Sequence, residues 1–194
     1  MAQFTILVMC TGNICRSPLA ELLLRQALAD LPVTTHSAGT QALVGRPMPD
    51  PQLDIARDLE IETPDEHRAQ QLTLDHVENA DLILAMGREH RSEAVRFTPK
   101  VLRKAFTLRE LARITEVVAG EDLIFEEKED VVTRLRRTVE AAALNRGLAL
   151  PAEHPEDDDV VDPYKRSQQT YLESRDQLVP AVHKVTAYLR RAAI

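Results

Sequence analysis

The segment Cys10-Thr11-Gly12-Asn13-Ile14-Cys15-Arg16-Ser17 is the feature that most constrains this chain. It lies between an apolar run at residues 4–9 and a helical pattern that begins at Pro18. A short buried strand that turns tightly into a helix directs several backbone N–H groups, and the positive end of the helix dipole, towards one point. Gly12 and Asn13 tolerate the left-handed backbone angles that such a turn requires. The segment is therefore predicted to form an anion-binding loop.

Three side chains of this loop have the chemistry for cleaving a phosphate ester. Cys10 lies at the mouth of the predicted anion site, which favours the nucleophilic thiolate form of its side chain. Arg16 carries a planar, permanently charged guanidinium that can contact two phosphate oxygens at once. Ser17, followed by Pro18, is predicted to be the N-cap of the helix, with a hydroxyl that also donates to the Cys10 thiolate. The spacing alone also fits a buried structural cysteine and an unrelated arginine.

The whole string resembles the signature of the low molecular weight protein tyrosine phosphatases, which has the form Cys-x-Gly-Asn-x-Cys-Arg-Ser-Pro. Residues 10–18 match it throughout. The resemblance implies a phosphatase that forms a phosphocysteine at Cys10, binds phosphate with Arg16, acts on phosphotyrosine-containing proteins and needs no metal or organic cofactor. The residues expected around the substrate are Thr11, Gly12, Asn13, Ile14, Cys15, Ser17, Leu43 and Tyr164.

A general acid is expected far downstream, at Asp162-Pro163-Tyr164. Cleavage of a phosphate ester releases an alkoxide or phenolate, so a proton must be delivered as the bond breaks. Asp-Pro alone is an ordinary turn signal, but the resemblance supplies the acid from an Asp-Pro motif near the C-terminus, which Asp162 matches. Tyr164 is expected either as an aromatic wall of the pocket or as a buried turn residue. The acidic run at 156–159 is interpreted as a solvated loop, with a magnesium site as the less favoured reading.

The resemblance also assigns supporting residues. Ser37 and His67 match positions at which the family holds the asparagine of its loop, here Asn13. A single histidine is more often a surface or packing residue, so this role competes with an ordinary structural one. No comparable argument exists for His36 or His90.

Two positions qualify the comparison with that family. Many relatives carry an aromatic residue where this chain has Leu43, so a preference for phosphotyrosine is a weaker expectation than phosphatase chemistry. Cys15 is expected to trap Cys10 as a reversible disulfide under oxidation, as the resemblance implies, or simply to pack beside it.

Alternating segments of apolar and amphipathic character predict the fold. The run at 81–85 is almost continuously apolar, which suits a strand of a parallel sheet covered on both faces. We therefore predict an α/β fold with a doubly wound, four-stranded parallel sheet of the flavodoxin-like kind, and the anion loop at the carboxyl end of its first strand. Strands are expected at 4–9, 33–38, 81–85 and 104–107, and helices at 18–30, 50–59, 88–95 and 167–191, the last kinked or restarted near Pro180.

The chain is about 40 residues longer than a typical member of that family, and the surplus lies near residues 115–157. Within it, residues 130–146 place apolar side chains at helical spacing, and Gly147 follows where a helix would end. We expect a single phosphatase-like domain, residues 1–194, with an extra helical insertion before the general-acid loop. The inserted helix either packs on the body or forms a lid or partner-binding element.

Composition narrows the partners and the compartment. A net charge of -7 and an isoelectric point near 5.4 argue against nucleic-acid binding. The N-terminal apolar run is too short for a signal peptide, and no segment is long enough for membrane insertion. Two cysteines without an export signal indicate a reducing cytoplasm, no disulfide framework and no zinc site. The oligomeric state is not predicted.

Two other functions fit the same residues. An arsenate reductase shares this scaffold and thiolate loop, but the thioredoxin-linked kind needs further cysteines, and none follows Cys15. Only a version that uses an external thiol therefore fits. A non-catalytic phosphoprotein-binding module would keep the anion site but would not need Asp162.

Overall fold

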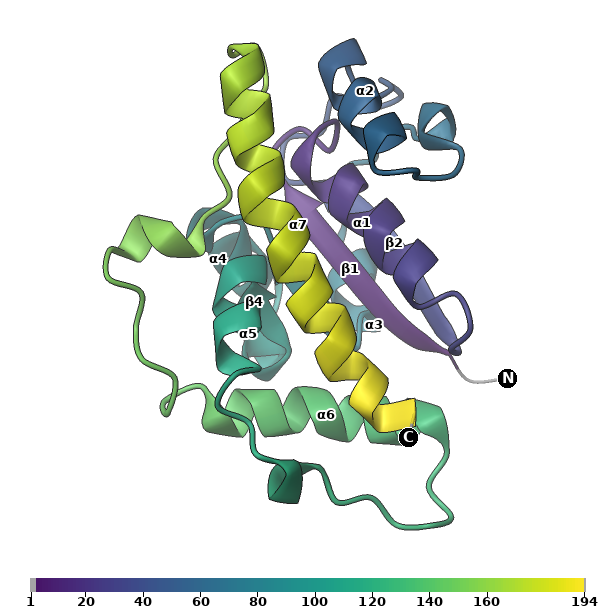
Figure 1. Ribbon diagram of the computed structural model, residues 1–194, viewed down its shortest axis with the longest axis vertical. Helices are drawn as coiled ribbons and strands as arrows, with labels where there is room; N and C mark the ends of the chain where they lie inside the picture. The colour runs from purple at the N-terminus through teal and green to yellow at the C-terminus, as the bar shows by residue number, and fades with distance from the viewer. Residues whose placement is uncertain (1–2, 194) are drawn as a thin grey trace.

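A computed structural model describes residues 3–193 as a parallel sheet with helices on both faces (Figure 1). Neighbouring strands are parallel, and the carboxyl ends of the first strand and its neighbours lie together, with Cys10 opposite Gly39 and Met9 opposite Ala85. The predicted four-stranded, flavodoxin-like α/β fold is thereby confirmed. The strands are β1 (Phe4–Cys10), β2 (Val33–Gly39), β3 (Leu82–Ala85) and β4 (Ala105–Thr107), in the spatial order β2-β1-β3-β4.

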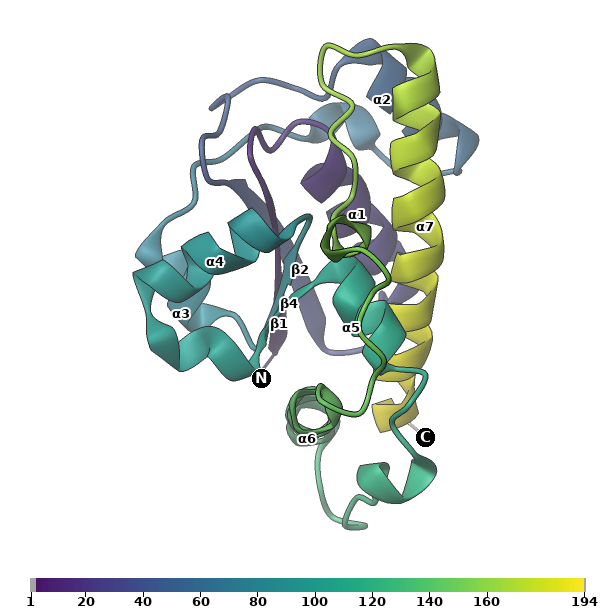
Figure 2. The same cartoon turned by 90° about the vertical axis from the view of Figure 1, so that its left-hand side faces the viewer.

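The helices form two layers around this sheet. Figure 2 shows α3 and α4 on one face and α1, α5 and α7 on the other. The α-helices are α1 (Arg16–Ala27), α2 (Asp50–Asp58), α3 (Leu74–Asn79), α4 (Arg88–Phe97), α5 (Leu108–Ile114), α6 (Val131–Asn145) and α7 (Gln168–Arg190). Short 3-10 helices occupy Pro64–Glu66, Pro99–Arg103, Gly120–Leu123, Pro155–Asp158 and Arg191–Ala193.

Alternation along the central strand explains why the sheet needs both layers. Ile6 and Val8 belong to the larger apolar cluster on the side of α1 and α7, whereas Leu7 and Met9 belong to the smaller one on the side of α4. Successive side chains of a strand point to opposite faces. A strand that is apolar at every position is therefore stable only between two covering layers.

Helices α1 and α7 differ from the sequence prediction. Helix α1 begins at Arg16, and Cys15 occupies the N-cap position without a side-chain hydrogen bond, so the N-cap role of Ser17 was wrong. The Ser17 hydroxyl is already engaged by Cys10 and Asn13 and is not free to cap the helix. Helix α7 continues through Pro180 without a restart, with that residue on the exposed side of the helix.

The inserted segment contains the expected helix, α6, which lies at the end of the sheet opposite the Cys10 loop (Figure 1). Arg136 of α6 donates from Nε to Oδ1 of Asp81, the residue just before β3, at 2.8 Å. Tyr188 of α7 donates its hydroxyl to the Thr138 carbonyl at 2.7 Å. Helix α6 therefore covers the amino ends of the strands and does not cover the loop that follows β1.

Candidate active site

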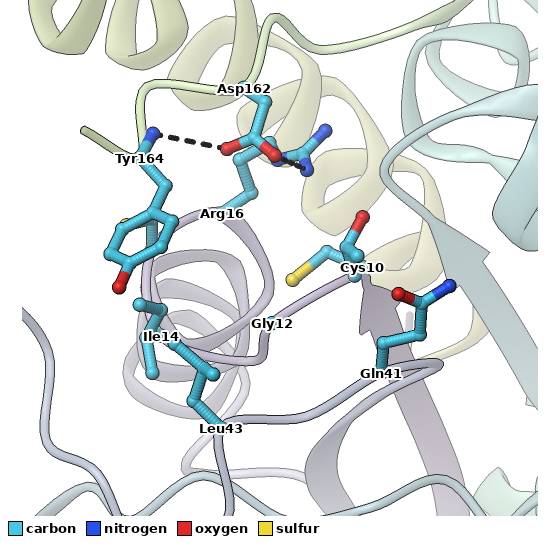
Figure 3. Close-up of a pocket in the computed structure, with 10 residues that line it drawn as sticks. Cys10, Gly12, Ile14, Arg16, Gln41, Leu43, Asp162 and Tyr164 are labelled. Carbon is cyan, nitrogen blue, oxygen red and sulfur yellow. Dashed lines mark hydrogen bonds and ion pairs between the residues drawn. The ribbon is translucent and has the colours of Figure 1, made fainter. Parts of the chain in front are cut away.

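A cavity of about 200 Å³ opens at the carboxyl end of β1, and Figure 3 shows the side chains around it. Most residues predicted from the sequence lie in its wall. Asn13 and Ser17 are exceptions, because both are fully buried beneath the loop and do not line the cavity. Gln41 lines it without having been predicted. The lining residues are Cys10, Thr11, Gly12, Ile14, Cys15, Arg16, Gln41, Leu43, Asp162 and Tyr164.

The sulfur of Cys10 has two donors aimed at it. The Ser17 hydroxyl oxygen lies 2.9 Å from Sγ, and the backbone N–H of Asn13 donates to Sγ at 3.3 Å. The second contact requires the left-handed backbone of Asn13, whose φ is 54°, whereas Gly12 does not adopt a positive φ as the sequence had suggested. Both donors stabilise negative charge on the sulfur. The loop therefore favours a nucleophilic thiolate at this position.

A buried network holds Asn13 in that conformation. Its Nδ2 donates to the Ser37 hydroxyl at 2.8 Å, and its Oδ1 accepts from the backbone N–H of Gln70 at 2.7 Å. Ser37 in turn donates to Glu21 at 2.5 Å. Nε2 of His67 lies 2.7 Å from the Asn13 carbonyl, and burial lowers the pKa of His67, so a neutral ring donates this bond. Ser37 and His67 thus contact the residue that the sequence prediction paired with them, and Glu21 was missed.

Arg16 and Asp162 lie side by side in the cavity wall (Figure 3). The Arg16 guanidinium donates from Nη2 to Oδ2 of Asp162 at 2.6 Å and from Nη1 to the Val160 carbonyl at 3.0 Å. Its Nε is buried without a hydrogen-bond partner among residues 3–193. The other oxygen of Asp162 accepts from the Tyr164 backbone N–H at 3.1 Å. The cavity therefore contains the Arg16 guanidinium, whose Nε has no partner, beside the half-exposed carboxylate of Asp162.

Three further residues, Ile14, Leu43 and Tyr164, give the cavity wall an apolar part. Ile14 and Leu43 lie on one side, and the Tyr164 ring faces them (Figure 3). Tyr164 is 37% exposed, so the interpretation as a buried turn residue was wrong. The segment that carries Leu43 is bonded to the Cys10 loop, since the N–H groups of residues 40, 41 and 43 donate to the carbonyls of residues 10, 11 and 12 at 2.9–3.0 Å. The two sides of the anion site are thus one hydrogen-bonded unit.

The sequence of this chain is similar to those of known phosphatases. The sequence profile of the family described as low molecular weight phosphotyrosine protein phosphatase matches residues 5–145. The chain belongs to this phosphatase family. The probable low molecular weight protein-tyrosine-phosphatase EpsP of Ralstonia solanacearum is 40% identical over 139 residues, which are 71% of this chain and 92% of the relative. The phosphatase Etp of Escherichia coli K12 is 41% identical over 107 residues, 54% of this chain and 70% of Etp.

Solved structures of such phosphatases share the fold. The tyrosine phosphatase AmsI of Erwinia amylovora superposes with a TM-score of 0.65 at 27% identity, covering 96% of this chain and 93% of AmsI. The YwlE arginine phosphatase of Geobacillus stearothermophilus gives 0.67 at 26% identity, with 96% and 93% covered. The family is thus shown, while the phosphorylated residue named for these proteins differs, being tyrosine for AmsI and arginine for YwlE.

The second cysteine of this phosphatase is a buried neutral thiol. Burial, followed by the nearby charge of Cys10, raises the pKa of Cys15 to about 12. Both cysteines are free thiols in the structure. A disulfide between them under oxidation stays a prediction.

The acidic run before Asp162 is more ordered than a solvated loop. Asp159 forms an ion pair with Arg88 at 3.0 Å, and Asp158 forms one with Arg113 at 2.5 Å. The arginines occupy the oxygens that the magnesium interpretation would need. Within residues 3–193, no three His, Cys, Asp or Glu side chains are arranged to hold a metal ion, and no helix has the length and apolarity to cross a bilayer.

Proposed function

We propose that this phosphatase hydrolyses phosphotyrosine in proteins through a phosphocysteine at Cys10. One observation carries the proposal: a thiol with two aimed donors, a guanidinium and a carboxylate share one small cavity. Arg16 and Asp162 come together from positions 146 residues apart in the chain. The profile match ends before Asp162, so the general acid rests on this geometry and on the Asp-Pro resemblance.

Substrate binding begins with the phosphate group. Backbone N–H groups of residues 11–16 and the Arg16 guanidinium hold its nonbridging oxygens. The unused Nε of Arg16 provides one donor, and Nη2 becomes the second when phosphate replaces the carboxylate of Asp162 there. Asp162 is then released from its ion pair and can accept or hold a proton at the leaving-group oxygen.

The reaction then proceeds in two steps. Cys10 Sγ attacks phosphorus in line as the bond between phosphorus and the leaving oxygen breaks, and Asp162 gives its proton to that oxygen. A water molecule next attacks the phosphocysteine, Asp162 takes a proton from the water, and the S–P bond breaks to release inorganic phosphate. Ser17 and the Asn13 N–H stabilise the thiolate that enters the first step and leaves the second.

The cavity walls favour an aromatic leaving group. Ile14, Leu43 and Tyr164 offer flat, apolar surface to a phenyl ring. A phosphoarginine side chain would place its charged guanidinium against these apolar side chains. Asp162 is the only acidic residue that lines the cavity. An arsenate reductase cycle would rest on the two cysteines of the chain and an external thiol.

The sequence and the apolar core also bear on the domain organisation, the partner and the cellular compartment. We propose one phosphatase domain with an insertion near residues 115–157, because α6 residues such as Leu135 join the same apolar cluster as Phe4 and Leu178. The partner is a phosphotyrosine protein and not a nucleic acid, consistent with the net charge of -7. We also propose a reducing, cytoplasmic setting, where a thiolate nucleophile and its neighbouring thiol stay reduced.

A panel of substrates tests this proposal. The purified chain is assayed with peptides that carry phosphotyrosine, phosphoserine or phosphoarginine, and with arsenate in the presence of glutathione. We expect efficient phosphate release from phosphotyrosine alone, at a rate that does not change on adding a chelator. Faster release from phosphoarginine, or thiol-dependent reduction of arsenate without phosphatase activity, would overturn the substrate assignment.

A further inference from the structure

One buried histidine touches the Cys10 loop and has no part in the reaction described above. His90 lies in the first turn of α4 and is 2% exposed. Its Nε2 lies 2.9 Å from the hydroxyl oxygen of Thr11, which is 79 positions away in the sequence. Burying an imidazole is unfavourable unless its polar atoms are used. The contact therefore calls for a functional explanation.

Thr11 separates two cavities. On one side it lines the catalytic cavity with Cys10 and Arg16, and on the other it lines a polar cavity of about 230 Å³. The residues that line the polar cavity are Thr11, Thr40, Gln41, Glu89, His90 and Glu93. Thr11 therefore lies between the catalytic cavity and His90.

The opposite edge of the His90 ring is fixed by close packing. Nδ1 is buried without a hydrogen-bond partner among residues 3–193. A Cβ atom at Gly87 would lie 3.3 Å from Nδ1 and 3.3 Å from Oδ1 of Asp159, a tight approach on both sides. Glycine at position 87 thus allows the backbone to approach the ring. The imidazole has one polar contact to the loop, at Nε2, and a packed edge elsewhere.

The surroundings determine which atom of the pair donates. Burial, followed by the positive charge of Arg16, lowers the pKa of His90 to about 4, so the ring is neutral near pH 7. A carboxylate oxygen of Glu89 lies 3.4 Å from Nε2, and a carboxylate only accepts. This favours the tautomer with the proton on Nε2. The Thr11 oxygen then accepts from His90, which leaves the Thr11 hydroxyl proton unused.

We propose that His90 is a positioning residue for the phosphatase reaction: it holds the Thr11 oxygen from behind, so that the Thr11 hydroxyl donates to a nonbridging oxygen of the bound phosphate. The inference rests on the proposed function, because it concerns the anion that Cys10 attacks. It adds a side-chain donor to the backbone N–H groups of the loop. The effect of His90 is exerted entirely through Thr11, without contact between the imidazole and the substrate.

A double-mutant cycle tests the inference. His90→Leu and Thr11→Val each remove one half of the pair, and we expect each to raise KM for an aryl phosphate and Ki for inorganic phosphate about tenfold, the effect of one hydrogen bond to a charged group. The double variant should be no worse than either single variant, because both remove the same contact. His90→Gln places an amide N–H near the position of Nε2 and should restore most of the phosphate affinity.

Two controls separate this role from a structural one. Thermal melting of each variant checks folding, and His183→Gln, at an exposed position on α7, should change neither constant. Additive effects of the two substitutions, or a fall in kcat with unchanged Ki for phosphate, would overturn the inference. A wild-type chain that does not hydrolyse aryl phosphates would instead refute the proposed function, whereas phosphate affinity, measured by calorimetry, would still report on the pair.

Discussion

The two loops that form the catalytic cavity are built in opposite ways. In the Cys10 loop, Cys10, Asn13 and Ser17 are at most 2% exposed, and their polar atoms are joined by hydrogen bonds. In the Asp162 loop, the Asp162 side chain is 47% exposed and Tyr164 is 37% exposed. The loop of the proposed nucleophile is therefore preorganised, while the loop of the proposed general acid is open to solvent.

The difference has a consequence for the order of events. Preorganised donors need no rearrangement when charge develops, and this makes them effective in catalysis. Asp162, in contrast, is held mainly by Arg16 and by the backbone N–H of Tyr164. In the proposed mechanism phosphate competes for the same guanidinium, so that substrate binding itself would release the acid. The buried loop would thus control when the exposed proton donor becomes available.

The largest effect is expected at the nucleophile. Cys10→Ser should lower kcat by at least about 10⁴-fold, because a hydroxyl lacks the nucleophilicity of a thiolate. Inorganic phosphate should still bind, since the surrounding donors are unchanged. Single-turnover kinetics and calorimetry with phosphate measure the two quantities. Residual activity above a few percent would mean that the rigid loop is not the attacking one.

A second substitution tests the contact that joins the two loops. Arg16→Lys keeps the charge but loses the planar pair of donors, and we expect kcat/KM to fall roughly 10³-fold. The substitution also removes the 2.6 Å contact between Arg16 Nη2 and Asp162. Arg88→Lys, which alters an ion pair outside the cavity, is the matched control. Similar rates for both variants would show that Arg16 does not bind the substrate.

The same contrast explains what the sequence could predict. The Cys10 loop is continuous in sequence, so its motif indicated the nucleophile, the arginine and the anion site. Asp162 was found only through the family resemblance, because an Asp-Pro pair has no chemistry of its own without the cavity. His90 was missed, since its contact with Thr11 depends on how β3 and α4 are placed by the whole sheet.

The local structure was also only partly predictable. The strands β1 and β3 followed from their apolar runs, but α3 and α5 are too short for a clear helical period. Capping boxes do mark them, with Thr73 and His76 at α3 and Thr107 and Glu110 at α5. The N-cap prediction for Ser17 failed for a different reason, because its hydroxyl forms hydrogen bonds with Cys10 and Asn13 instead.

A smaller effect is expected at the exposed loop, and it depends on the substrate. Asp162→Asn should slow hydrolysis of phenyl phosphate by about 10²-fold, because this leaving group needs a proton. An activated ester, whose phenolate leaves unaided, should be affected much less. Asp159→Asn is the matched control, since that carboxylate pairs with Arg88 and not with the cavity. Leaving-group dependence in Asp159→Asn alone would place the general acid three residues earlier.

The smallest effect concerns the stability of the buried side of the site in acid. The pKa of His90 is about 4 in the folded chain and 6.5 for a free imidazole, so the unfolded chain binds more protons between these values. The free energy of unfolding should therefore fall as the pH drops from 6.5 to 4, by up to about 3 kcal/mol. His90→Gln should lose this part of the pH dependence, while other titrating groups, including His67, stay the same. Urea denaturation of both proteins at several pH values measures it, and parallel curves would show that the imidazole is not held neutral. The charged groups around the ring are the same in both proteins, and these are Arg16, Glu89, Glu93, Asp159 and Asp162.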